Sequence, residues 1–286
     1  MGAIESVGVV LHPSRAPQEA IATLMAWAAG HEIPVFGLDE EVGRLDCGAR
    51  PVSDAELAAR SSILVSLGGD GTMLRSLRLA HDQRTPVLGV NNGRLGFLAE
   101  VDLEDLPMAL SAIDAHEYTV EARSCINCDT SPSHVIAYND VALVRVPGDG
   151  VAAVEVVVEG EPFVRYSADA VVVATPTGST AYSYSAGGPI VSPTVEGLLV
   201  IPAAPHSTFN RALMLNHDER LTLQVLGSSG RLAVEVDGIV SGYVGPGASI
   251  AFTVDSAAGK VVRIGRTTFY ERARRKLQVS GSAEAF

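Results

Sequence analysis

The stretch "SLGGDGTMLRSLRLA", residues 66–80, decides how the first part of the chain folds. It overlaps the apolar run Ile63–Leu67, which reads as a buried strand, and a helical pattern begins at Met73. A glycine turn between a strand and a helix brings backbone N–H groups close to a phosphate. The same turn holds a lone carboxylate, Asp70, which would repel a phosphate. We therefore expect Asp70 to have a different role.

Strands and helices alternate on both sides of this turn. This alternation predicts βαβ units and a parallel sheet, which is a Rossmann-like α/β arrangement. Such sheets bind ligands at the carboxyl ends of their strands, where Asp70 lies. Gly30 is expected to cap the first helix and Ser53 to begin the second. The expected strands are 6–11, 33–38, 62–67 and 85–91, and the expected helices are 16–29, 54–60, 73–80 and 102–113.

The sequence changes character near His116. From there it consists of valine-rich, strand-like segments separated by turn signals such as Pro147–Gly150 and Gly227–Gly230. We therefore expect an α/β domain over residues 1–115 and a β-rich domain over residues 116–265. A basic C-terminal helix over residues 266–280 is expected to pack back on the first domain.

Charge and cysteine content narrow the function classes. The net charge of −12 disfavours a general nucleic-acid binder, which needs a basic face. No apolar run reaches the ~18 residues of a transmembrane helix, and the N-terminus lacks a signal-peptide pattern. Three cysteines suggest reduced thiols in the cytoplasm. Cys125 and Cys128 have CxxC spacing, but only His134 lies nearby, so we expect ordinary strand cysteines and not a zinc site.

Several later stretches carry polar residues in strand or loop settings. "YNDVAL" at 138–143 fits either an edge-strand bulge or contacts to ribose and adenine. "SADAVVVATPTGSTAYSYSAGGPI" at 167–190 favours close approach to a polar ligand over a plain surface loop. His206 is expected to be structural, and Asp237 to begin a hairpin turn. GxxxxGK[ST] and GxGxxG do not occur, so a phosphate cradle would rest on backbone amides and arginines.

Six motifs in order resemble the NAD kinase family over almost the whole chain. They are "GGDGT" (68–72), "NNGRLGFL" (91–98), "YNDVAL" (138–143), "ADAVVVATPTGSTAYSYSAGGPIVSP" (168–193), "PHSTFNRAL" (205–213) and "VDG" (236–238). "GGDGT" also resembles turns of diacylglycerol kinases, sphingosine kinases and phosphofructokinases, whereas "TPTGSTAYSYSAGGP" is specific to NAD kinases. The resemblance implies an α/β domain and a β-rich domain with the active site between them. It also implies transfer of the γ-phosphoryl group of ATP, or in some members polyphosphate, to the adenosine ribose 2′-hydroxyl of NAD, which gives NADP.

The resemblance also assigns roles to residues. The aspartate of GGDGT takes the ribose proton as general base, and here this is Asp70. Asn139 and Asp140 match the family's Asn-Glu pair, which holds the NAD adenosine, and Asp169 matches the aspartate of an Asp-Gly pair. The other residues expected to bind the nucleotides are Gly68, Gly69, Gly71, Thr72, Arg75, Phe97, Thr177, Thr180, Ala181, Tyr182, Ser183, Tyr184 and Ser185.

This sequence departs from the family pattern at four positions. Asp140 is one methylene shorter than the usual glutamate, and Ala170 stands where glycine is usual. Ser167 stands where some members carry an arginine linked to preference for NAD over NADH, and Ile239 where some carry a glutamine. These departures leave open whether NAD or NADH is preferred. They do not change the expected reaction.

The resemblance further implies a divalent cation, Mg²⁺ by expectation, which is held mainly through the substrate phosphates. It implies a homodimer or homotetramer, with NAD and ATP or polyphosphate as ligands and neither nucleic acid nor membrane as a partner. A lipid kinase of the diacylglycerol type would share GGDGT but would leave the hydroxyl-rich segment 175–185 without a role. A nucleotide-sensing protein that retains the fold is the non-enzymatic alternative, and the intact Asp70 argues against it.

Overall fold

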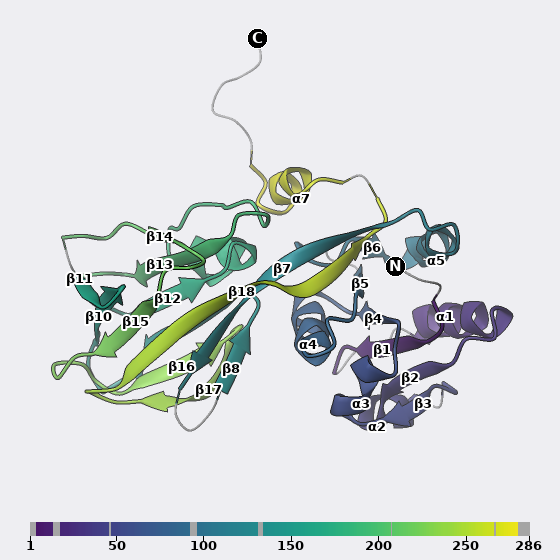
Figure 1. The fold of residues 1–286 in the computed structure, drawn as a ribbon, viewed down its shortest axis with the longest axis horizontal. Helices are drawn as coiled ribbons and strands as arrows, with labels where there is room; N and C mark the ends of the chain where they lie inside the picture. Colours follow the sequence, from purple (N-terminus) through teal and green to yellow (C-terminus); the bar gives the residue numbers. More distant parts are fainter. Residues whose placement is uncertain are drawn as a thin grey trace, which may run out of the picture. The chain divides into compact units, whose positions relative to one another are not determined.

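The computed structural model describes residues 4–13, 18–45, 47–91, 96–130, 134–206, 208–265 and 267–279. The chain forms two compact units (Figure 1). Unit 1 comprises Met1–Ala122 and Gly259–Phe286, and unit 2 comprises Arg123–Ala258. The unit boundaries fall inside two long strands, β7 (Thr119–Asp129) and β18 (Ser249–Arg263), whereas the expected boundaries fall after residues 115 and 265.

Unit 1 is built on a parallel sheet, as its alternating pattern predicts. The strands pair in the order β3-β2-β1-β4-β5, the end of β18 pairs in parallel with β5, and β6 also pairs with β5. The central strands are buried along their length, which is why they read as continuous apolar runs. The elements are β1 (Val7–Leu11), α1 (Gln18–Gly30), β2 (Val35–Leu38), α2 (Asp39–Gly43), β3 (Arg50–Val52), α3 (Asp54–Ala59), β4 (Ile63–Leu67), α4 (Asp70–Ala80), β5 (Val87–Asn91), β6 (Val101–Asp102), the 3-10 turn η1 (Leu103–Asp105), α5 (Leu106–Asp114) and α7 (Phe269–Lys276).

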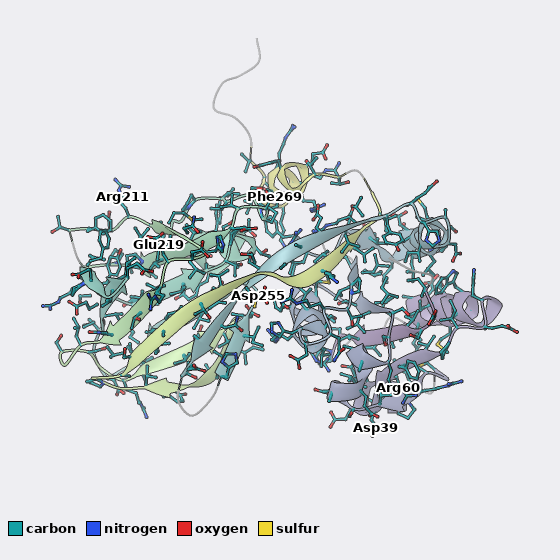
Figure 2. All side chains as sticks on the ribbon, in the orientation of Figure 1. Asp39, Arg60, Arg211, Glu219, Asp255 and Phe269 are labelled. Carbon is teal, nitrogen blue, oxygen red and sulfur yellow. The ribbon has the colours of Figure 1, made fainter. Side chains whose placement is uncertain are left out.

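Apolar side chains of the helices form the core of unit 1 with the sheet. Leu24 of α1 and Leu110 of α5 are buried in one cluster with Val9 and Val65 of the strands. Burying a side chain of this size contributes about 1.5–3 kcal/mol. At the periphery, the Arg60 guanidinium lies 4.4 Å from the centre of the Phe36 ring (Figure 2 labels Arg60). The described helices include none that is long and apolar enough to cross a bilayer.

Unit 2 is β-rich, as expected. One antiparallel sheet has the order β14-β13-β12-β9-β16-β17, and a second set of antiparallel strands pairs in the order β11-β10-β15-β18, with β8 paired to β7. Residues from both sets share one buried cluster, so the two sheets pack face to face. The elements are β8 (His134–Ala137), β9 (Asp140–Arg145), β10 (Ala152–Val158), β11 (Glu161–Ala168), β12 (Ala170–Ala174), η2 (Thr177–Thr180), α6 (Tyr182–Ser185), β13 (Gly197–Ala203), β14 (Leu213–Asn216), β15 (Leu221–Val225), β16 (Leu232–Val236) and β17 (Ile239–Val244).

A two-residue turn joins β16 to β17. Asp237 and Gly238 both have positive φ, 49° and 79°, which is the conformation that a tight hairpin requires. The Asp-Gly pair therefore forms the predicted hairpin turn. The turn lies beside the start of β9, because the Asp237 N–H donates to the Asp140 carbonyl at 2.9 Å.

Candidate functional site

Asp70 is the first residue of α4. Gly69 precedes it with an extended backbone as the N-cap, so the helix begins three residues before the expected start at Met73. The expectation that Asp70 lies in the glycine turn before the helix is therefore wrong. A carboxylate in the first turn of a helix is stabilised by the helix dipole, which explains how the helix can start on an acidic residue.

The Asp70 carboxylate is held in place by the backbone of the loop that follows β5. The backbone N–H groups of Phe97 and Leu98 donate to Oδ2 and Oδ1, at 2.9 and 3.0 Å. A Cβ on Gly96 would lie 2.2 Å from Oδ1, so only glycine lets the loop approach this closely. Lys276, at the end of α7, donates to Oδ2 at 2.9 Å. Asp70 thus has a defined position and charge, although residues 92–95 of the "NNGRLGFL" motif lie outside the described part of the chain.

The surroundings of Asp70 keep it ionised. Burial pushes the pKa of its carboxyl upward, but the Phe97 N–H, the charge of Lys276 and the Leu98 N–H outweigh burial. Together they hold the pKa of Asp70 below its ordinary value. The carboxylate is therefore in its proton-accepting form at neutral pH.

The three glycines of GGDGT differ in whether packing requires a glycine at their position. A Cβ on Gly68 would lie 2.2 Å from Thr72 Oγ1, so Gly68 is needed for the packing of α4. A Cβ on Gly69 or Gly71 would meet open space. At these two positions no atom within 4 Å of the Cβ position obstructs approach to the backbone.

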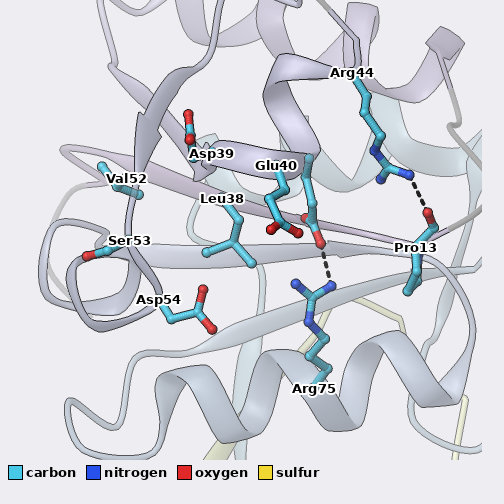
Figure 3. Close-up of a pocket in the computed structure, with 10 residues that line it drawn as sticks. Pro13, Leu38, Asp39, Glu40, Arg44, Val52, Ser53, Asp54 and Arg75 are labelled. Atoms are coloured by element: carbon cyan, nitrogen blue, oxygen red, sulfur yellow. Dashed lines mark hydrogen bonds and ion pairs between the residues drawn. The ribbon is translucent and has the colours of Figure 1, made fainter.

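Arg75 lies on α4 but points into a pocket formed by α2, α3 and α4 (Figure 3). Its guanidinium pairs with the buried Glu41, which also accepts from the Leu11 N–H at 2.8 Å. The pocket has a volume of about 650 Å³. Four of its lining residues are acidic and two are arginines, so it does not favour a polyanion; the charged lining residues are Asp39, Glu40, Glu41, Arg44, Asp54 and Arg75. The expected contact of Arg75 with NAD stays a prediction.

In unit 2 the structure brings two predicted motifs together. Thr175 donates from Oγ1 to the Tyr138 carbonyl at 2.7 Å, and its N–H donates to the Asn139 carbonyl at 2.8 Å. A Cβ on Gly178 would lie 2.0 Å from that same Asn139 oxygen. The glycine of "TPTGSTAYSYS" is therefore required for direct contact with the "YND" segment.

Asp140 is buried beside this contact and lies near a second, partly exposed carboxylate, Asp237. Asp237 accepts from the Asn139 N–H at 2.7 Å and so holds the segment in place. Burial, and after it the charge of Asp237, raise the pKa of Asp140 to about 7. The hydrogen bond from the Tyr182 N–H acts in the opposite direction and is outweighed. Among the described residues, the Asp140 Oδ2 atom is buried and finds no hydrogen-bond partner. Such an atom is suited to accept from an amino or hydroxyl group of a ligand.

The hydroxyl-rich segment uses part of its hydroxyls internally. Thr180 donates to the Thr177 carbonyl at 3.3 Å, and Ser185 to the Ala181 carbonyl at 3.5 Å. Ser183 is buried, whereas Tyr184 is exposed. Burial, followed by the nearby carboxylates, raises the pKa of the Tyr182 hydroxyl.

Two further candidates lie at the periphery of this part of unit 2. Asp169 accepts from the Arg145 guanidinium at 2.5 Å, and both side chains are partly exposed. Ile239, where some family members carry a glutamine, is exposed at the first residue of β17.

The two cysteines with CxxC spacing are ordinary strand residues, as expected. Cys125 and Cys128 lie in β7, and burial raises the pKa of each thiol to about 12, which makes both unreactive. His134 faces Asp129 at 2.9 Å instead. His206 is exposed in the loop after β13 and donates its backbone N–H to the Ser167 carbonyl at 2.7 Å.

Lys276 is a site residue that the sequence does not predict. Local patterns cannot reveal it, because it lies 206 residues from Asp70 along the chain. The available signal is that the chain has only two lysines, Lys260 and Lys276, and the second falls in the basic stretch 271–276. Asp237 has a second role that its turn motif does not indicate, because its side chain accepts the hydrogen bond from the Asn139 N–H.

The chain thus combines an α/β unit, which carries an ionised aspartate just after a buried strand, with a β-rich unit, which carries a buried aspartate. Comparison with known proteins shows that its class is a phosphotransferase and identifies the family. The ATP-NAD kinase N-terminal domain matches residues 23–118, and the ATP-NAD kinase C-terminal domain matches residues 138–264. The chain belongs to the NAD kinase family.

Individual relatives agree with this assignment. NAD kinase 1 of Streptomyces avermitilis is 36% identical over 99% of this chain and 89% of its own length. NAD kinase of Heliobacterium modesticaldum is 38% identical over 96% of this chain and 98% of its own. The crystal structure of yeast NADH kinase complexed with NADH has a TM-score of 0.86 and 26% identity, and covers 100% of this chain and 91% of the yeast chain.

Proposed function

We propose that this protein is an NAD kinase that transfers the γ-phosphoryl group of ATP to the 2′-hydroxyl of the adenosine ribose of NAD. The observation that carries the proposal is the ionised Asp70 at the carboxyl end of β4, held by the Phe97 and Leu98 N–H groups. Membership of the NAD kinase family supports the choice of substrates.

In this mechanism Asp70 is the general base. A ribose hydroxyl is a weak nucleophile while it keeps its proton, and a carboxylate within hydrogen-bond reach accepts that proton as attack proceeds. The hydroxyl oxygen forms a bond to the γ-phosphorus, and the bond from that phosphorus to the β,γ-bridging oxygen breaks. ADP leaves with the electron pair. The unobstructed backbone at Gly69 and Gly71 would bind phosphate oxygens beside the base.

The residues around Asn139 are proposed to hold the adenosine of NAD. The unpartnered Oδ2 of Asp140 supports this role, because an adenine amino group or a ribose hydroxyl would satisfy it. The Gly178 contact and the Asp237 hydrogen bond would keep this segment rigid.

Magnesium is proposed to enter with the donor's phosphates, because Mg²⁺ in such reactions is bound largely by substrate oxygens. The residues present do not fit a resident metal site. Both oxygens of Asp70 accept hydrogen bonds, and the described residues contain no cluster of three His, Cys, Asp or Glu side chains suited to a metal. When bound, the cation would offset charge on the phosphates.

Three finer points are proposals from the family resemblance. The protein is proposed to act in the cytoplasm in NADP biosynthesis, as a homodimer or homotetramer. Polyphosphate is proposed as a second donor. NADH is proposed as a weaker acceptor, because Ser167 replaces the arginine of some NAD-selective members.

One assay tests the proposed function. Purified protein, ATP and Mg²⁺ are incubated with NAD or with diacylglycerol, and NADP is scored with a dehydrogenase that requires it. We expect NADP only with NAD, and a loss of about 10²–10⁴ in kcat for Asp70→Asn with little change in NAD binding. Phosphorylated lipid, or binding of NAD without turnover, would favour a lipid kinase or a nucleotide sensor instead. Near-normal kcat in the variant would end the assignment of Asp70 as base.

A further inference from the structure

Four donors surround the Asp70 carboxylate. Oδ1 faces the N–H groups of Leu98 and Ala99, at 3.0 and 3.5 Å. Oδ2 faces the Phe97 N–H and the Lys276 ammonium, each at 2.9 Å. A carboxylate offers about four acceptor positions, so these donors fill it. A substrate hydroxyl can reach an oxygen of Asp70 only by replacing one of them.

Three of the donors belong to a rigid loop. Their N–H groups are part of the backbone at 97–99, which Arg263 fixes by donating to the Leu98 carbonyl at 2.8 Å. Arg263 is itself buried and paired with Glu100 and Glu121, so the loop cannot easily withdraw. The replaceable donor is therefore the fourth.

The Lys276 ammonium is held beside Oδ2 of Asp70 by two contacts, and its side chain is exposed enough to move away. Its ammonium lies 4.6 Å from the centre of the Phe97 ring and 2.9 Å from Oδ2, on a flexible side chain that is 34% exposed. At the N-terminal end of α7, Thr268 and Glu271 form a capping box and Arg272 donates to the Thr267 carbonyl at 2.7 Å. The helix is anchored by its buried face, which comprises Arg272 and Ala273. The helix stays in place while the end of the side chain is free to move.

We propose that Lys276 is a positioning residue for Asp70, whose ammonium occupies the acceptor hydroxyl's place on Oδ2 in the free enzyme and gives it up when the hydroxyl binds. This inference rests on the proposed function. Before substrate arrives, the ammonium keeps the carboxylate oriented and ionised. Once it leaves, its charge no longer weakens the base, so Asp70 gains proton affinity at the moment when it must accept a proton.

Binding measurements without turnover test this displacement. The Kd of NAD is measured by calorimetry for the wild type and Lys276→Met, and again with a NAD analogue that lacks the 2′-hydroxyl of the adenosine ribose. Because the ammonium competes with the hydroxyl, Lys276→Met should bind NAD about two- to five-fold more tightly, in line with an ion pair of this exposure. It should gain nothing for the 2′-deoxy analogue, and nothing for NAD in an Asp70→Asn background.

Two matched variants complete the test. Arg274→Met removes a cation from the same helix at an exposed position and should leave both Kd values unchanged. Lys276→Arg keeps a cation and should bind NAD like the wild type. Unchanged or weaker NAD binding by Lys276→Met, or an equal gain for the 2′-deoxy analogue, would overturn the displacement while leaving NADP formation intact. A wild-type protein that neither binds NAD nor forms NADP would overturn the proposed function first.

Discussion

At the scale of single residues, Gly96 determines how tightly the loop can hold the Asp70 carboxylate. Its missing side chain leaves room for Oδ1, which would otherwise lie 2.2 Å from a Cβ. No local pattern around Gly96 shows this, because the atom that needs the space belongs to a residue 26 positions earlier. The importance of Asp70 itself is predictable, since a lone carboxylate in a glycine-rich segment after a buried strand is visible in the sequence.

We predict that Gly96→Ala damages catalysis. The added methyl group must displace the carboxylate or the loop, which costs about 1–3 kcal/mol of stability and moves the base. The expected result is a fall in kcat of at least ~10-fold, since catalytic groups tolerate little misplacement. Gly30→Ala is the control, because a Cβ there meets open space. Equal rates for the two variants would contradict this account.

The buried Asp140 predicts a pH-dependent stability. Its folded pKa of about 7 lies above the ordinary value of ~3.9, so its contribution is full below about pH 4 and is lost as pH rises through 7. We expect Asp140→Asn to gain stability relative to the wild type between pH 4 and 8, by up to a few kcal/mol. Urea unfolding at several pH values measures this. A similar gain in the exposed Asp218→Asn would show that Asp140 is not its source.

At the scale of elements, the end of α1 differs from expectation. Gly30 does not cap the helix; it is the last helical residue, and the left-handed residue is Glu32, with φ 56°. The Ile33 N–H donates to the Ala28 carbonyl and the Glu32 N–H to the Ala29 carbonyl, which is a Schellman motif. The left-handed residue of the motif thus comes two residues later than Gly30 suggests. It is Glu32, whose Cβ makes this conformation sterically unfavourable.

We predict that Glu32→Gly stabilises unit 1. Glycine adopts positive φ without strain, and the left-handed conformation costs other residues about 1–2 kcal/mol. Part of that gain is offset by the greater freedom of glycine in the unfolded chain, so about 0.5–1 kcal/mol is expected. Urea unfolding measures it. Glu32→Ala removes the same carboxylate but keeps the Cβ, and an equal stabilisation in that variant would assign the effect to charge.

Apolar runs account for the elements that the sequence predicts. β4 and β12 are buried throughout, and both read clearly as strands. β18 is not predicted, because small and polar residues from Asp255 to Lys260 interrupt its apolar pattern in mid-strand. β13 is also missed, since its apolar run ends in Pro202 and reads as the start of a loop. Strand pairing is decided by partners distant in sequence, which a local pattern does not contain.

At the scale of the whole molecule, the scarcity of lysine bears on the choice of phosphate donor. The chain has only two lysines, Lys260 and Lys276, and no Walker motif. We therefore expect the phosphates of the donor to be held through backbone amides, arginines and a cation. Such a cradle recognises phosphates more than adenine. The family resemblance leads to the same expectation, because some members accept polyphosphate.

We predict that polyphosphate replaces ATP at least weakly and that EDTA abolishes activity with either donor. Initial rates with ATP or polyphosphate, against NAD or NADH, with and without Mg²⁺, measure this directly. EDTA should act because the phosphate charge is then left uncompensated. Strict dependence on ATP would contradict recognition of the donor mainly through its phosphates. Full activity in EDTA would contradict the need for a cation.

The two long strands that cross the unit boundary set an order of events during synthesis. Unit 1 is discontinuous: β18 pairs with β5 through Val261 and Val262, and α7 follows still later. All of unit 2 therefore leaves the ribosome before the sheet of unit 1 has its edge strand. Until then β5 presents unpaired backbone groups to other chains, which is a route to aggregation. Lys276, the ion-pair partner of Asp70, is among the last described residues to be made. Under the proposed mechanism, the nascent chain therefore has its general base long before it has the ammonium group that positions it.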